Sequence, residues 1–175
     1  QAGEVRLARC MNQVNATLGP NKKKPPHFRN LCHEQRVAYC DILSRHSLKT
    51  ISVLINKRSI NEPAKFGFPR LYFYTTKFLL ERASWICRDL QSSDSCKIEI
   101  IFSNRARMSY EDLKGYIVKL RQGRDIYRAN IHWDAIDENL IDSQNPDSLK
   151  GLHAADAVAS SMYYGLNINN YGFIE

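Results

Sequence analysis

The sequence predicts an α/β fold in which helices flank a mixed sheet, because short β-branched segments alternate with longer segments of helical periodicity. The clearest strand is KIEIIF, residues 97–102, which is short and mostly apolar. The clearest helix, residues 71–90, repeats large apolar side chains at spacings of three and four. The 175 residues are the length of one domain, so we expect a single domain over residues 1–175.

Apolar spacing predicts five helices, and sequence signals mark some of their ends. Gly19-Pro20 ends the first helix, and Ser109 followed by Asp112 begins the fourth. The predicted helices cover residues 4–18, 31–44, 71–90, 110–122 and 152–166. In the helix at 71–90, we expect the inward face to carry Leu71, Tyr74, Phe78, Trp85 and Ile86. In the last helix, we expect Ala155, Val158, Ala159, Met162 and Leu166 to face inward.

Three strands are predicted. They are TISVLIN at residues 50–56, KIEIIF at 97–102 and the alternating segment 126–133. Residues 134–148 are acidic and polar and contain Pro146, which predicts irregular structure. Three strands are few for such a sheet, which usually has about five or six. Because the chain begins at Gln1 without a Met, we expect that it lacks one or more N-terminal strands and is part of a longer protein.

The charge is basic and unevenly spread along the chain. Lys and Arg number 25 against 18 Asp and Glu, a formal charge of +7. Residues 1–88 contain 16 basic and 5 acidic side chains, whereas residues 89–175 contain 9 and 13. A basic half favours a polyanion such as nucleic acid, with Lys57 and Arg58 at the end of a predicted strand as contacts. A merely solvated basic surface is the alternative.

The cysteines and the hydropathy favour a cytoplasmic protein without a membrane segment. The five cysteines are odd in number, and their spacing is not that of a zinc site. Free thiols in a reducing compartment are the expected state. No run approaches the 18 to 20 consecutive apolar residues, roughly, that a membrane-spanning helix needs.

One carboxylate stands out in the segment GLHAADAVA, residues 151–159. Asp156 lies in an otherwise apolar helix, where a buried, unpaired carboxylate costs several kcal/mol. It is therefore expected to bind a metal ion, pair with a base or cap a neighbouring backbone group. His153, three residues earlier, can share its helix face and a water or an ion. The acidic segment that contains Asp134, Asp137, Glu138 and Asp142 either supplies further ligands or is a solvated loop.

In its order of motifs, the sequence resembles the bacterial "domain of unknown function 3800" family, whose fold is similar to ribonuclease H. The closing segment GLHAADAVA is similar to the family's Gly-Leu-Gln-x-Ala-Asp signature, with Asp156 on the aspartate and His153 on the glutamine. The other similar segments are HFRNL at 27–31, TISVLINK at 50–57, LYFYTTKFLLER at 71–82 and IEIIFSNR at 98–105.

The resemblance implies a centre of carboxylates that binds Mg²⁺ or Mn²⁺, with Asp156 as a catalytic residue and metal ligand and His153 as its catalytic partner. Arg105 matches a basic residue common in the family and joins Lys57 and Arg58 as a predicted nucleic-acid contact. Two departures stand against this centre. No Asp-Glu-Ser-Gly motif occurs, and Ser103-Asn104 replaces a carboxylate at a strand end.

Two functions therefore stay open. The first is a metal-dependent nuclease of the ribonuclease H type that cleaves nucleic-acid phosphodiesters, with an intact or a degenerate site. The second is a non-catalytic subunit that binds nucleic acid or a protein partner, or assembles as a homo-oligomer, in a phage-defence or mobile-element system.

Overall fold

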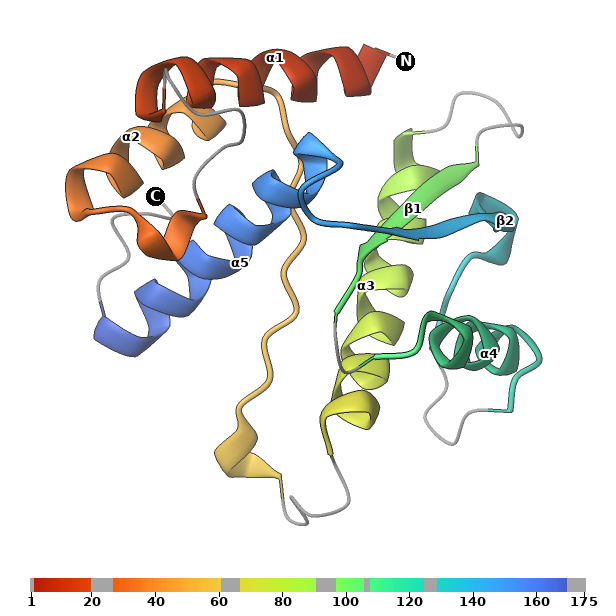
Figure 1. Ribbon diagram of the computed structural model, residues 1–175. Helices are drawn as coiled ribbons and strands as arrows, with labels where there is room; N and C mark the ends of the chain where they lie inside the picture. Colours follow the sequence, from red (N-terminus) through yellow and green to blue (C-terminus); the bar gives the residue numbers. More distant parts are fainter. Residues whose placement is uncertain are drawn as a thin grey trace. The chain divides into compact units, whose positions relative to one another are not determined.

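The computed structural model describes most of the chain and divides it into two compact units. The described residues are 2–19, 27–60, 67–90, 97–105, 108–124 and 129–169. The helical unit is Gln1–Ser52 with Asn145–Glu175, and the sheet unit is Val53–Gln144. Over the described residues the chain has five α-helices and two strands (Figure 1), which confirms the α/β class. The single domain expected over residues 1–175 stays a prediction.

The helical unit consists of three helices and one 3-10 turn around a single apolar core. In chain order they are α1 (Ala2–Leu18), the 3-10 turn η1 (Phe28–Asn30), α2 (His33–Ser44) and α5 (Lys150–Ile168). Figure 1 shows α5 beside α1 and α2, although about a hundred residues separate it from them in sequence. The core is formed by Cys10, Met11, Val14, Phe28, Leu31, Tyr39, Ile42, Ala154 and Ala157.

α5 packs against this core through its smaller side chains. Its buried residues are His153, Ala154, Ala157, Ser161 and Gly165. The expected inward face was wrong for Ala155, Ala159 and Leu166, which are exposed, whereas Val158 and Met162 are half-buried. Small side chains allow helix backbones to approach closely, so the Ala, Ser and Gly stripe takes the inner side and leaves larger apolar groups outside.

The sheet unit is built around one pair of parallel strands. Its elements are η2 (Lys57–Ser59), α3 (Phe68–Leu90), β1 (Ile98–Ser103), α4 (Tyr110–Arg121), η4 (Trp133–Ala135) and β2 (Ile136–Gln144). Ile98 pairs with Ile136, and the ladder resumes from Ile100 opposite Ile141 to Ser103 opposite Gln144. β2 therefore bulges over residues 137–140. The buried core is Leu80, Leu113, Ile117, Leu120, Ile131, Ile136 and Ile141.

α3 buries polar side chains as well as apolar ones. Its most buried residues are Thr76, Lys77, Leu80, Glu81 and Ser84. The stripe expected inside, namely Leu71, Tyr74, Phe78, Trp85 and Ile86, is only half-buried. Glu81 Oε2 accepts a hydrogen bond from the Asn130 backbone N–H at 2.7 Å, and Ser84 Oγ accepts one from His132 N–H at 3.1 Å. The polar face of α3 thus holds the segment that precedes η4.

These bonds explain why the strand predicted at 126–133 was wrong in its described part. Residues 129–132 form no regular element, and 133 begins a 3-10 turn. The backbone N–H groups of Asn130 and His132 bond to α3 side chains rather than to a neighbouring strand. Residues 125–128 lie outside the described residues.

Two further predictions about strands were wrong. Residues 50–56 form no strand, although their side chains alternate between half-buried and exposed as in a strand. β-branched residues favour a strand only when a partner strand completes the hydrogen bonds, and among the described residues only β1 and β2 pair. Conversely, β2 occupies residues 136–144, which were expected to be irregular.

The described residues also bear on the membrane and cysteine predictions. Within the described ranges, no helix is both long and apolar enough to span a bilayer. Cys10, Cys32, Cys40 and Cys87 form no disulfide with one another, and Cys96 lies outside the described residues. Burial raises the pKa of the Cys40 thiol to about 11, so this thiol stays protonated at neutral pH.

Candidate functional site

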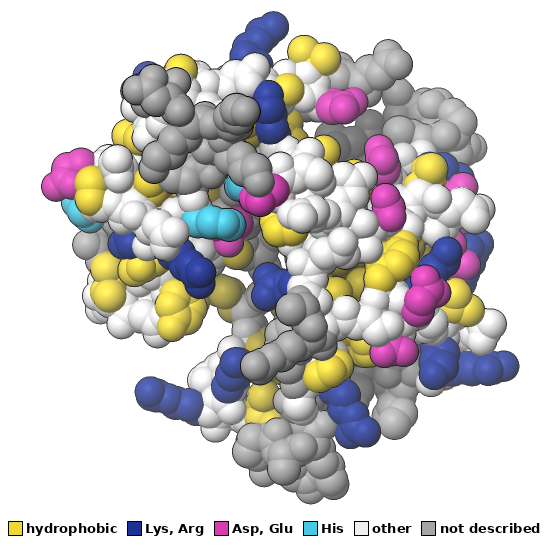
Figure 2. Space-filling model, viewed as in Figure 1, with side chains coloured by type: hydrophobic (Ala, Val, Ile, Leu, Met, Phe, Trp, Pro, Cys, Tyr) yellow, Lys and Arg dark blue, Asp and Glu magenta, His cyan; other side chains and the backbone are white. Residues whose placement is uncertain are grey.

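A carboxylate and an imidazole meet at the surface of the helical unit. Asp156 Oδ2 lies 3.7 Å from His27 Nδ1, and each side chain is 48% exposed. Asp156 comes from the first half of α5, and His27 comes from the residue before η1. The two groups form an ion pair whenever the imidazole is protonated. Figure 2 shows His side chains adjoining Asp and Glu side chains on the face that it presents.

A second imidazole lies beneath this pair. The ring centroids of His27 and His153 are 6.0 Å apart, and His153 is only 6% exposed. The carbonyl oxygen of His153 accepts a hydrogen bond of 3.4 Å from the hydroxyl of Tyr39, a fully buried residue of α2. Burial raises the pKa of Tyr39, and the negative charge of Asp156 adds to this effect. The pair therefore lies over two buried side chains, His153 and Tyr39.

The loop that presents His27 is anchored through the two residues that follow it. Phe28 is 1% exposed and packs edge-on against Tyr39, with ring centroids 5.6 Å apart. Arg36 of α2 donates hydrogen bonds to the carbonyl oxygens of Phe28 at 3.4 Å and Arg29 at 2.9 Å. The same guanidinium donates to the Tyr164 hydroxyl at 2.9 Å and lies 4.1 Å from the centre of the Tyr164 ring. Arg36 thus ties η1 to α5, the two elements that bring His27 to Asp156.

The exposure of Asp156 corrects one expectation from the sequence. The apolar neighbours in GLHAADAVA suggested a buried carboxylate, but Asp156 lies on the outer side of α5 beside the exposed Ala155. Its solvation therefore demands no ligand or partner. An exposed carboxylate next to an imidazole is nevertheless accessible to a cation or to a substrate proton.

Among the residues that the structure describes, no group of three or more His, Cys, Asp and Glu side chains is arranged to hold a metal ion. Asp156 and His27 offer two ligand atoms, with His153 deeper beside them. Two ligands suit a cation that keeps most of its water, as Mg²⁺ does. They do not suffice for two cations, each of which needs several oxygen ligands.

The acidic side chains after the third predicted strand do not complete such a site. Asp137 and Glu138 lie in the bulge of β2, where Glu138 pairs with Arg121 at 3.1 Å. Asp137 accepts a bond from Asn139 N–H at 2.9 Å, and Asp142 accepts one from Ser143 N–H at 2.7 Å. Each of these three carboxylates is therefore engaged locally.

The predicted basic contacts belong to the sheet unit. Lys57 and Arg58 lie exposed in η2. Arg105 is exposed just after β1, with its guanidinium 5.8 Å from the centre of the Tyr72 ring. Asp156 and His153 belong to the helical unit.

The carboxyl end of β1 bears neutral side chains. Ser103 is the last strand residue, and Asn104 N–H donates to the Gln144 carbonyl oxygen at 2.9 Å, which extends the pairing by one residue. No acidic side chain stands at positions 103–105, as the sequence already shows.

In the structure, the excess of basic side chains is shared between the two units. By sequence, the helical unit contains ten Lys and Arg against six Asp and Glu, and the sheet unit contains fifteen against twelve. The excess of residues 1–88 is therefore divided between both units, because residues 145–175 join the helical unit and residues 53–88 join the sheet unit. Lys and Arg side chains are scattered over the face seen in Figure 2 rather than collected in one patch.

Sequence reasoning missed His27 as a site residue. It follows a basic, proline-rich stretch and belongs to no periodic pattern, so no local signal ties it to Asp156, 129 positions later. The only signal was its place at the start of HFRNL, one of the segments that carry the family resemblance. Burial of Phe28 and the bonds of Arg36 bring the two residues together, and both contacts are tertiary.

Comparison of the chain with models of protein families, with curated proteins and with solved structures found no match.

Proposed function

We propose that this chain is a ribonuclease H-like phosphodiester hydrolase that acts on nucleic acid with the help of a divalent cation. The observation that carries the proposal is the exposed Asp156 carboxylate 3.7 Å from His27 Nδ1, over the buried His153 and Tyr39. The resemblance of GLHAADAVA to the family's closing signature supports the same assignment. Asp156 would hold Mg²⁺ or Mn²⁺, and His27 and His153 would assist.

The residues present fit one hydrated cation. Two ligand atoms bound to one ion at 2.0 to 2.2 Å lie roughly 3 Å apart, and small side-chain rotations bring the 3.7 Å pair to that separation. Mg²⁺ usually binds through one or two carboxylates, with waters and substrate phosphates as its other ligands. Such a cation would neutralise charge on a phosphodiester oxygen. The chain's own part is to fix the carboxylate and to keep an imidazole within reach of a proton.

Replacing Asp156 with Asn tests this assignment. The change keeps the volume and removes the charge, so we expect the rise in melting temperature that Mn²⁺ gives the wild type to fall to less than half in the variant. In parallel, hydrolysis of a labelled oligonucleotide should fall by about 100-fold or more, since cation binding supplies several kcal/mol at the transition state. Differential scanning fluorimetry across a Mn²⁺ series and a gel assay measure the two effects.

Asp41 provides a matched control for this test. It lies in α2 of the same unit, and its side chain is 46% exposed, close to the 48% of Asp156. Asp41→Asn should lose its pairing with Arg45 yet keep the full response to Mn²⁺. Equal responses of wild type and Asp156→Asn would refute the metal assignment.

The neutral end of β1 favours a second candidate, a non-catalytic subunit that binds nucleic acid or a protein partner. The family resemblance implies a carboxylate at this strand end, but the chain has Ser103 and Asn104 there. Nucleic-acid binding that persists in EDTA, with no cleavage at any Mn²⁺ concentration, would select this candidate over the hydrolase. Its phage-defence or mobile-element setting rests on the resemblance alone.

Both candidates predict a salt-dependent contact through Lys57 and Arg58. Replacing both with Glu should weaken binding to duplex DNA. It should also reduce the magnitude of the slope of log affinity against log salt concentration by about 0.9 for each phosphate contact that is lost. Fluorescence anisotropy over a salt titration measures the slope. An unchanged slope would remove these two residues from the nucleic-acid surface.

A further inference from the structure

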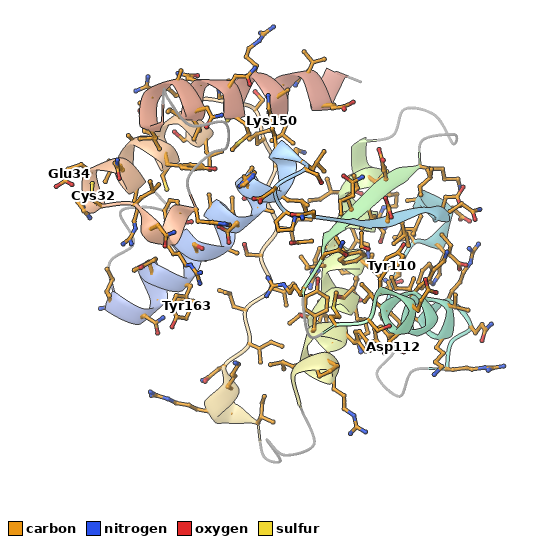
Figure 3. The ribbon with its side chains drawn as sticks, viewed as in Figure 1. Cys32, Glu34, Tyr110, Asp112, Lys150 and Tyr163 are labelled. Carbon is orange, nitrogen blue, oxygen red and sulfur yellow. The ribbon has the colours of Figure 1, made fainter. Side chains whose placement is uncertain are left out.

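The outer face of α5 carries an aromatic side chain that the core does not use. Tyr163 is 67% exposed in the C-terminal half of α5, where Leu166 and Ile168 are exposed as well. Figure 3 shows Tyr163 on the side of α5 that faces away from α1. Among the described residues, its one ring contact in the structure is with Tyr164, whose ring is nearly perpendicular with its centroid 6.3 Å away, so most of the Tyr163 side chain stays accessible to solvent.

Tyr163 stands in line with Asp156 on the helix. The two residues are seven positions apart, which is two helical turns, so they share one face of α5 with an axial separation of about 10.5 Å. Between them lies Ala159, which is exposed and short. The strip of surface that runs from Asp156 over Ala159 to Tyr163 therefore has a short side chain in its middle, a carboxylate at one end and an aromatic ring at the other.

Positive charge borders the strip. Arg36 is held beside α5 by its bonds to Arg29 O and Tyr164 Oη, and its guanidinium stacks on the Tyr164 ring. Arg29 is exposed in η1, which itself contacts α5. The fixed guanidinium of Arg36 loses little conformational freedom when it meets a phosphate, and with the exposed Arg29 it favours an anionic, base-bearing strand.

We propose that the outer face of α5 binds single-stranded nucleic acid, with a base stacked on Tyr163 and the backbone passing Arg36 and Arg29 toward Asp156. The proposal rests on the proposed function, because it names the substrate class of the same site. A single strand fits and a duplex does not, since only unpaired bases offer an open face to a protruding ring.

Anisotropy with labelled oligonucleotides of about 12 residues tests the proposal on the full chain in EDTA at low salt. Tyr163→Ala should weaken binding to single-stranded DNA and RNA about 5- to 150-fold, the range found for one stacked base. Tyr163→Trp should preserve affinity. For an abasic oligonucleotide, the affinities of the wild type and of Tyr163→Ala should agree within about twofold.

Val5→Ala is the matched control. Val5 is 58% exposed on α1 of the same unit, so its truncation should leave affinity unchanged. Equal affinity of Tyr163→Ala and wild type would overturn the proposal, as would an equal loss on the base-free strand or a preference for duplex. A dimer of the wild type that Tyr163→Ala dissociates in sedimentation would assign the face to self-association instead.

The outcomes separate this inference from the proposed function. If Asp156 binds no cation, the effect of Tyr163→Ala in EDTA is untouched. If Tyr163 stacks no base, the Mn²⁺ response of Asp156 is untouched.

Discussion

Truncation of Phe28 to Ala is expected to destabilise the protein by about 3–5 kcal/mol. Phe28 is 1% exposed in the core of the helical unit, and its edge-on packing against Tyr39 adds to the free energy of burial. Because whole domains are stable by about 5–15 kcal/mol, this is a large fraction of the total. Urea denaturation followed by far-UV circular dichroism measures the change in the free energy of unfolding.

The same substitution should also release the loop that presents His27. Hydrogen exchange in the peptide that contains η1 should rise more than exchange in α4, which belongs to the sheet unit. Val37→Ala on α2 provides the control, because Val37 is 44% exposed and its truncation should change stability by less than about 0.5 kcal/mol. A Phe28→Ala protein as stable as Val37→Ala would contradict the core assigned to the helical unit.

The helices were predictable because their signals are local. Apolar spacing at 71–90 and 152–166 corresponds to α3 (Phe68–Leu90) and α5 (Lys150–Ile168), and Ser109 caps α4 by accepting a bond from Asp112 N–H at 3.2 Å. Which side of a helix faces inward was less predictable. In α5, close packing selected Ala154, Ala157 and Gly165 over larger apolar groups.

The strands depended on partners that a local pattern does not show. TISVLIN has the composition of a strand but forms none, whereas the acidic β2 pairs with β1 through residues 141–144 and buries Ile136 and Ile141. Two isoleucines at the ends of a bulge give no regular alternation. The presence or absence of a partner strand, rather than residue preference, therefore decided which of the two segments forms a strand.

Of the two residues that meet in the candidate site, the sequence predicted Asp156 but not His27. Asp156 stood out as a charge within an apolar segment, although the structure exposes it. His27 carried no such contrast, and its role depends on Phe28 and Arg36, whose importance appears only when α2, η1 and α5 come together. Sequence periodicity does not reveal a site residue in a loop when the residues that hold the loop in place are distant in sequence.

Replacement of Arg36 with Ala is expected to cost about 2–3 kcal/mol of stability. Bonds from a charged donor contribute more than neutral ones, and truncation leaves the carbonyl oxygens of Phe28 and Arg29 without this donor. The stacking of the guanidinium on Tyr164 disappears as well. The free energy of unfolding in urea measures the change, and the Mn²⁺ response should fall with it, because η1 then no longer fixes His27.

Arg36→Lys and Tyr164→Phe separate charge from geometry. Lysine keeps the charge but cannot bond to three oxygens as a planar guanidinium does, so Arg36→Lys should lose more than half of the stability that Arg36→Ala loses. Tyr164→Phe keeps the ring and removes one acceptor, so it should cost only about 1 kcal/mol. The double variant should be destabilised by less than the sum of the two single variants, because both remove the same Arg36–Tyr164 bond. Strict additivity would show that Arg36 and Tyr164 do not stabilise the protein through their mutual hydrogen bond, and this bond would then no longer explain how η1 is tied to α5.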